Sequence, residues 1–126
     1  MKQLCPCGSG ESYQDCCNRI HENPKAAASA EQLMRARYAA FCLQHIDFLY
    51  NSFLPQTRRY QQKTAIAAWA EENQWQELQI VQASVNRVEF KAYYIDRNGD
   101  LHVHHEKSAF KQLNSQWYYV DGEIKG

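Results

Sequence analysis

The chain has 126 residues, of which 44% are hydrophobic and 22% are charged. This composition suits one globular core and excludes a disordered or fibrous protein. Fourteen Lys and Arg balance fourteen Asp and Glu, so the net charge does not indicate binding to nucleic acid or to an anionic membrane. No segment approaches the roughly 20 apolar residues of a spanning helix, and residues 1–8 lack the apolar core of a signal peptide. We therefore expect a cytoplasmic protein.

Four of the five cysteines are close together at the start of the chain, as Cys5, Cys7, Cys16 and Cys17. Because the cytosol keeps thiols reduced, clustered cysteines there are more often metal ligands or redox groups than disulfides. Neither pair has the C-x-x-C spacing of a catalytic dithiol. Four thiolates are the set that a closed tetrahedral Zn²⁺ site requires. The sequence therefore predicts one structural zinc ion with no coordination position left open for catalysis.

Residues 1–22 are predicted to form a small zinc-binding module of their own. Their sizeable apolar side chains are few, namely Leu4, Tyr13 and Ile20. So small a set cannot offset a backbone-ordering cost of about 1–2 kcal/mol per residue, which points to a metal as the stabilising element. Residues 8–10 allow a tight turn whose amides point at thiolates. Residues 13–18 are expected to contain a helical turn, in which adjacent cysteines can both face one ion.

The remaining residues, 28–126, have the pattern of an α+β domain. Ser29 and Gln32 form a capping box ahead of a helix expected over residues 30–44. A short second helix is expected to end before Pro55, and a third to cover residues 59–73.

From Gln76 onward the hydrophobic period changes to two, as in strands. Four strands are predicted, near residues 77–84, 87–96, 100–113 and 116–122. Asn98 and Gly99 both tolerate the positive φ of a type I′ hairpin turn. Short connections imply an antiparallel meander, and three helices placed before it can cover only one of its faces.

The segment CPCGSGESYQDCC, from Cys5 to Cys17, closely resembles the SEC-C motif. This short zinc-binding module occurs at the C-terminus of the SecA preprotein translocase ATPase and in many other bacterial proteins. The resemblance implies that Cys5, Cys7, Cys16 and Cys17 are the zinc ligands. The SecA form is similar, with histidine in the last place.

Nearly the whole chain is similar to the bacterial YchJ family. The matching segments are LMRARYAAF at 33–41, IDFL at 46–49 leading to Pro55, HEKSAF at 105–110 and QWYYVDG at 116–122. The resemblance implies a nuclear-transport-factor-2-like (NTF2-like, cystatin-type) cone of helices on a curved antiparallel sheet, after the zinc module. Some YchJ proteins carry a second SEC-C motif at the C-terminus, whereas this sequence has one such motif.

A second group of candidate residues lies in the third predicted strand. His102, His104 and Glu106 alternate and so share one face, which we expect to be the solvated outer face rather than a second metal or acid–base site. His105 shares the other face with Val103, where it either points into the cone or is a satisfied core histidine.

The two arginines of the first long helix lie about 200° apart and cannot form one patch. Arg35 or Arg37 faces the sheet and pairs with a buried carboxylate such as Asp47 or Glu106, or else both are solvated.

Two functions follow from these features. The first is a binding or adaptor protein with a protein or ribosome-associated partner, because the SecA copy of SEC-C is associated with chaperone, ribosome and anionic-lipid contacts. The alternative is a small-molecule-binding protein or enzyme with a pocket in the cone, for which Asp47, His105 and Glu106 are the titratable candidates. No residue is assigned a catalytic role, because fold analogy by itself is a weak argument.

Overall fold

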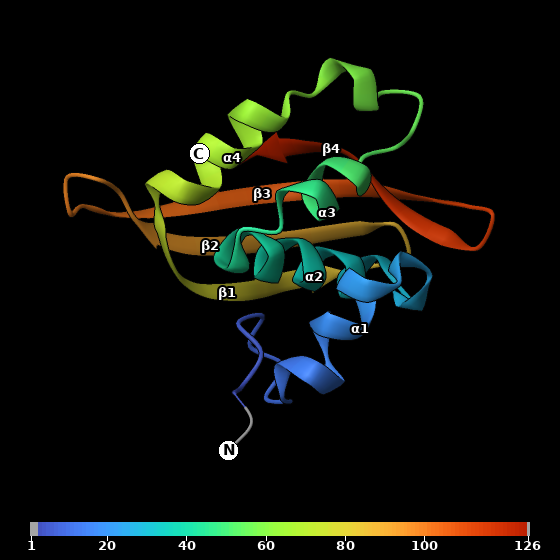
Figure 1. Cartoon of the computed structure of the whole chain (residues 1–126), viewed down its shortest axis with the longest axis horizontal. Helices are drawn as coiled ribbons and strands as arrows, with labels where there is room; N and C mark the ends of the chain where they lie inside the picture. Colours follow the sequence, from blue (N-terminus) through green and yellow to red (C-terminus); the bar gives the residue numbers. More distant parts are fainter. Residues whose placement is uncertain (1–2, 126) are drawn as a thin grey trace.

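The structure is a computed structural model in which residues 3–125 are described (Figure 1). Within them, the helices are α1 (Cys17–Glu22), α2 (Ala30–Leu43), α3 (Ile46–Asn51) and α4 (Lys63–Glu72). The strands are β1 (Gln74–Ala83), β2 (Arg87–Ile95), β3 (Leu101–Leu113) and β4 (Gln116–Ile124). The strands pair antiparallel in the order β1-β2-β3-β4. The predicted α+β class and meander are therefore confirmed.

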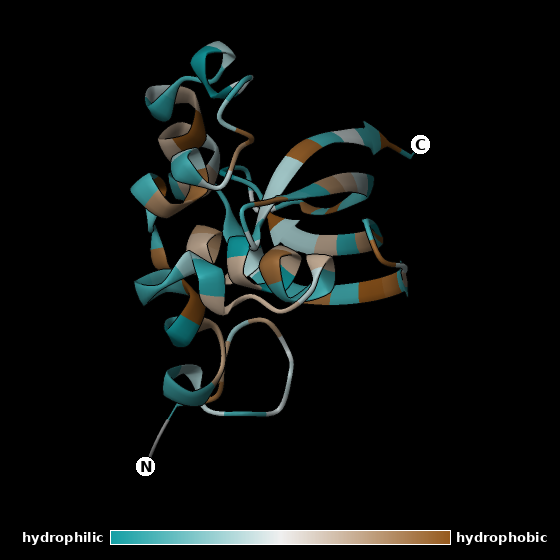
Figure 2. Cartoon of the chain, turned by 90° about the vertical axis from the view of Figure 1, so that its right-hand side faces the viewer, coloured by the Kyte–Doolittle hydropathy of each residue, from teal (hydrophilic) through white to brown (hydrophobic). Residues whose placement is uncertain are grey.

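Helices and sheet form two layers. Figure 2 shows the helices on one side of the strands, with the N-terminal segment below them. Within residues 3–125, none of the helices combines the length and the apolar character that are needed to cross a membrane.

The helix boundaries follow local capping. The predicted helix over 30–44 is α2, and the Ser29 hydroxyl accepts a hydrogen bond of 3.1 Å from the Gln32 amide. It ends at Leu43, and its C-cap Gln44 has a left-handed φ of 63°. The third helix begins later than expected because a 3₁₀ turn, Arg58–Tyr60, comes first and Gln62 is extended.

The hairpin turns differ from the prediction. Of Asn98 and Gly99, only Gly99 has a positive φ, of 86°, so the two do not form a type I′ turn. The carboxylate of Asp96 instead accepts from the amides of Asn98 and Asp100, which supports a longer loop. The positive-φ pair occurs between β3 and β4, where Asn114 has φ 50° and Ser115 φ 66°.

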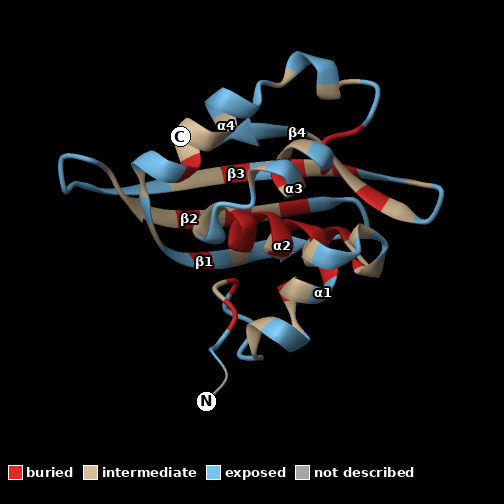
Figure 3. Cartoon of the chain, viewed as in Figure 1, coloured by how far each residue is buried: buried red, intermediate tan, exposed pale blue. Residues whose placement is uncertain are grey.

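The core is centred on α2, in which eight of the fourteen residues are buried (Figure 3). One continuous buried cluster includes Cys5, Cys7 and Cys17 together with Leu33 of α2 and Leu78 of β1. The cysteine segment therefore packs directly on the cone. The boundary between 1–22 and 28–126 stays a prediction.

Candidate functional site

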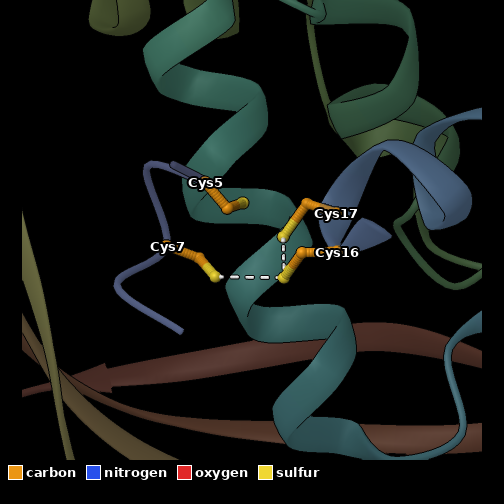
Figure 4. A group of neighbouring side chains, drawn as sticks. All are labelled: Cys5, Cys7, Cys16 and Cys17. Atoms are coloured by element: carbon orange, nitrogen blue, oxygen red, sulfur yellow. Dashed lines mark hydrogen bonds between the residues drawn. The ribbon is translucent and has the colours of Figure 1, made fainter. Parts of the chain in front are cut away.

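The four clustered cysteines come together at the N-terminal end of the molecule. Cys5 and Cys7 lie on a loop and Cys16 and Cys17 at the start of α1, and Figure 4 shows their side chains gathered in the space between. All four sulfur atoms lie within 4.8 Å of one another. None is in a disulfide, and the Cys7–Cys16 and Cys16–Cys17 sulfur distances are 3.6 and 3.9 Å. Such a group can hold one metal ion.

Backbone geometry places the first cysteine pair. The Cys5 amide donates to the Glu11 carbonyl at 2.8 Å, which closes a hairpin-like loop. Gly8 and Gly10 both have positive φ, of 83° and 88°, so the tight turn between them requires glycine. The Ser9 hydroxyl lies 3.1 Å from the Cys16 sulfur and joins the two halves of the cluster.

The thiols perturb one another strongly. Hydrogen bonds with Cys17 and Cys5, and then with Ser9, lower the pKa of the Cys7 thiol. Hydrogen bonds to Cys5 and Cys7, together with burial, raise the pKa of Cys17. The cluster therefore keeps part of its protons when no cation is bound, and a bound dication would displace them.

Two side chains connect the cysteine loop to the cone. Arg35 of α2 donates from Nη1 to the Cys7 carbonyl at 2.8 Å and also pairs with Glu31 at 3.0 Å. The Tyr13 hydroxyl oxygen lies 2.6 Å from His21 Nδ1, and His21 Nε2 donates to the Ala36 carbonyl at 2.7 Å. The position of the loop is therefore set by α2.

A second candidate site is a cavity of about 370 Å³ between the helices and the sheet. Its apolar wall is largely aromatic, and its polar groups are few. Its lining includes Tyr38, Phe41, Trp69, Trp75, His104, Glu106, Tyr119 and Asp121, with Arg37 at the α2 wall. This size lies at the lower end of the range for small-molecule pockets, roughly 300–1,000 Å³.

Glu106 is the central polar group of the cavity and is 8% exposed. His104 Nε2 lies 2.8 Å from Oε1, and the hydroxyls of Ser108 and Tyr119 donate to Oε2 at 2.5 and 2.7 Å. Burial by itself would raise the pKa of Glu106, but these hydrogen bonds outweigh it and hold the pKa below its usual value. The carboxylate is therefore ionised and fully engaged at neutral pH.

Arg37 of α2 is 7% exposed and faces the same cavity. Its Nη1 donates to the Ser52 hydroxyl and the Leu49 carbonyl. Its guanidinium lies 4.1 Å from the ring centre of Tyr119, whose hydroxyl binds Glu106. Burial lowers the pKa of Arg37, and the charges of Tyr119 and Glu106 oppose that shift.

Comparison with known proteins matches both parts of this structure. The family described as "YchJ, middle NTF2-like domain" matches residues 29–122, and the SEC-C motif matches residues 1–19. The chain belongs to the YchJ family. The family match also confirms the NTF2-like fold class.

Relatives extend over nearly the whole chain. A UPF0225 protein of Actinobacillus succinogenes is 37% identical, over 99% of this chain and 84% of its own. A UPF0225 protein of Geobacter sulfurreducens is 36% identical, over 97% of this chain and 80% of its own.

Two solved structures of SEC-C motif containing proteins have the same fold as this YchJ-family chain. The solution structure from Rhodopseudomonas palustris has a TM-score of 0.87 at 35% identity and covers 100% of both chains. The crystal structure from Psychrobacter arcticus has a TM-score of 0.80 at 34% identity, over 98% of this chain and 84% of its own.

The face assignment of β3 was wrong. His104 and Glu106 line the cavity, whereas His105 lies on the other face and pairs with Glu89 at 2.7 Å. His102 shares the face of His104, but it lies beyond the cavity and pairs with Asp96 at 2.6 Å. The alternation along β3 correctly placed His104 and Glu106 on one face and His105 on the other. It did not show which of the two faces meets the helices.

The YchJ-family structure also shows where the remaining candidates lie. Asp47 is exposed and pairs with Lys63 at 2.9 Å, away from the cavity. Of the two arginines, Arg37 faces the sheet and lies near Glu106, one of the two carboxylates proposed for it.

Sequence reasoning missed Tyr119 and Gly122 as parts of the Glu106 site. The sequence did contain a signal for which face of β3 is buried. Phe110 is apolar, lies on the same face of the strand as Glu106, and is 3% exposed. Gly122 had no such signal. A Cβ there would overlap the Glu106 carboxylate, and only the register of β3 and β4 reveals this.

We predict that Glu106→Gln destabilises the protein in a pH-dependent manner. The folded-state pKa of Glu106 is depressed, so its ionised form stabilises the protein above the ordinary carboxyl value of 4.5, and this contribution is lost as the pH falls through the folded pKa. At pH 7 the variant should lose about 1.5–3 kcal/mol of unfolding free energy, measured by urea denaturation. The deficit should shrink in acid.

The matched control is Glu89→Gln, which removes a carboxylate from the opposite face of the sheet. It should cost less than about 1 kcal/mol. Equal losses for the two variants, or a deficit that does not change with pH, would contradict the role assigned to Glu106.

Proposed function

We propose that Cys5, Cys7, Cys16 and Cys17 bind one structural Zn²⁺ ion. Zn–S bonds of about 2.3 Å in a tetrahedron place sulfur atoms about 3.8 Å apart. Two of the sulfur–sulfur distances here, 3.6 and 3.9 Å, lie on either side of that value, and this observation carries the proposal. Four thiolates leave no open position, so the ion stabilises the fold rather than reacting. The expected cytoplasmic location would keep the thiols reduced.

The proposed ion holds the loop of Cys5 and Cys7 against the start of α1. Three of its ligands belong to the same buried cluster as Leu33 and Leu78. The aromatic rings around the cavity pack on one another, so we expect the cone to keep its fold without metal.

Purified protein should contain close to one zinc per chain, measured by inductively coupled plasma mass spectrometry. Cys16→Ser should lose the metal, because three thiolates form an incomplete set. Cys42→Ser is the matched control, since Cys42 lies on α2 outside the cluster, and it should keep the metal. Metal-free protein with intact, reduced cysteines would refute the zinc site.

For the cone we propose small-molecule binding. The supporting observation is the cavity of about 370 Å³ in which an aromatic wall meets the His104–Glu106 pair. A mostly apolar pocket with a few convergent polar groups is the usual form of a ligand site. This arrangement favours small-molecule binding, the second of the two functions derived from the sequence. His104 takes the place in the cavity that was expected for His105.

A thermal-shift screen of small aromatic compounds should yield ligands that raise the melting temperature. Ala92 lines the cavity and is 3% exposed, so Ala92→Leu fills the space and should abolish the shift. Ala109→Leu, on the adjacent strand, is the control and should retain it. A shift that survives Ala92→Leu would place the ligand elsewhere and count against the proposal.

The adaptor hypothesis is supported by a separate observation, the SEC-C match at residues 1–19. In this proposal the zinc module presents a rigid surface to a protein or ribosome-associated partner, and Leu4, which is 70% exposed, supplies an apolar side chain to that surface. A pull-down with the intact chain should recover a partner that the Cys16→Ser, Cys17→Ser double variant loses. If the double variant retains every partner, the module is not the contact surface.

A further inference from the structure

The walls of the cavity are aromatic rings that pack edge to face or tilted against one another. The ring centre of Trp75 lies 5.4 Å from Phe41, 5.4 Å from Trp69 and 6.3 Å from Tyr38. His104 continues this wall, with its ring centre 6.0 Å from that of Trp69. Rings held by one another in this way present rigid planar surfaces, which complement a planar apolar ligand.

The two buried charges of the cavity compensate each other. Arg37 lies over the ring of Tyr119, and the hydroxyl of the same ring donates to Glu106. Glu106 accepts three hydrogen bonds in all, so both of its oxygen atoms are occupied. Asp121, at the wall, is exposed, so water screens its charge. A charged ligand group would lose its hydration here without gaining an uncompensated counter-charge.

His104 is a polar wall group with one ring nitrogen left for a ligand. Its Nε2 is committed to the Glu106 carboxylate at 2.8 Å, which leaves Nδ1 as its other ring nitrogen. A neutral imidazole that donates through Nε2 keeps a lone pair on Nδ1 and accepts a hydrogen bond there. The carboxylate thus orients the ring, as such partners do for histidines that bind metals or protons.

We propose that the cavity takes an uncharged, planar aromatic molecule bearing a hydroxyl group, which donates to His104 while Glu106 acts as the positioning residue. This inference rests on the proposed small-molecule function of the cone and names the ligand class of the same site. The aromatic wall favours a planar ligand, the compensated charges disfavour an ionic one, and His104 favours a ligand with a hydrogen-bond donor.

The test compares four probes that share one ring system: 2-naphthol, naphthalene, 2-naphthoate and 2-naphthylmethylammonium. Binding is followed at neutral pH by the indole N–H resonances of Trp69 and Trp75, with Trp117 outside the cavity as the internal control. We expect 2-naphthol to bind about fivefold more tightly than naphthalene, the effect of one net hydrogen bond. The two ions should bind at least about tenfold more weakly than 2-naphthol.

Two variants at adjacent positions distinguish a loss of ligand recognition from a general loss of protein stability. His104→Phe keeps a ring in the wall but removes the acceptor, so naphthalene should still bind and the preference for 2-naphthol should disappear. His105→Phe changes the other face of the same strand and should leave both affinities unchanged.

The outcomes distinguish this inference from the function on which it rests. If none of the four probes binds, the small-molecule function of the cone fails together with the inference. If naphthoate binds most tightly, Arg37 selects an anion, so the ligand class is overturned while the cavity function stands. A hydroxyl preference that is absent, or that persists in His104→Phe, likewise overturns the inference alone.

Discussion

The close packing of α2 is the constraint on which both sites depend. Ala30, Ala36, Ala39 and Ala40 are all at 0% exposure, so neighbouring elements approach the helix backbone directly. Side chains this small contribute little apolar area each, and their stabilising effect comes from dense packing on several sides. The cysteine segment and the sheet therefore share one core through this helix.

Helical periodicity lets α2 serve both sites. Arg35 and Arg37 are two residues apart and so point in directions about 200° apart. Arg35 donates to the Cys7 carbonyl, whereas Arg37 lies in the cavity over the Tyr119 ring. A shift of α2 would move both contacts together.

A buried carboxylate constrains the sheet in the same manner. Glu106 remains ionised only because donors from His104, Ser108 and Tyr119 reach it at once. Tyr119 comes from β4, so the pairing of β3 with β4 must hold its register, and Gly122 must leave room for the carboxylate. Glu106 therefore constrains the register of β3 and β4, the need for glycine at position 122 and the orientation of the His104 ring.

The amino-acid sequence by itself determined the elements and the cysteine cluster, because capping, period and spacing are local properties. Ser29 caps α2 as expected, and the SEC-C spacing placed four thiols within reach of one another. Tertiary structure decided which face of β3 meets the helices, and hence that His104 rather than His105 enters the cavity. It also brought Arg37 and Glu106 together. Alternation along a strand is symmetric between its two faces, and only packing against α2 and α4 removes that symmetry.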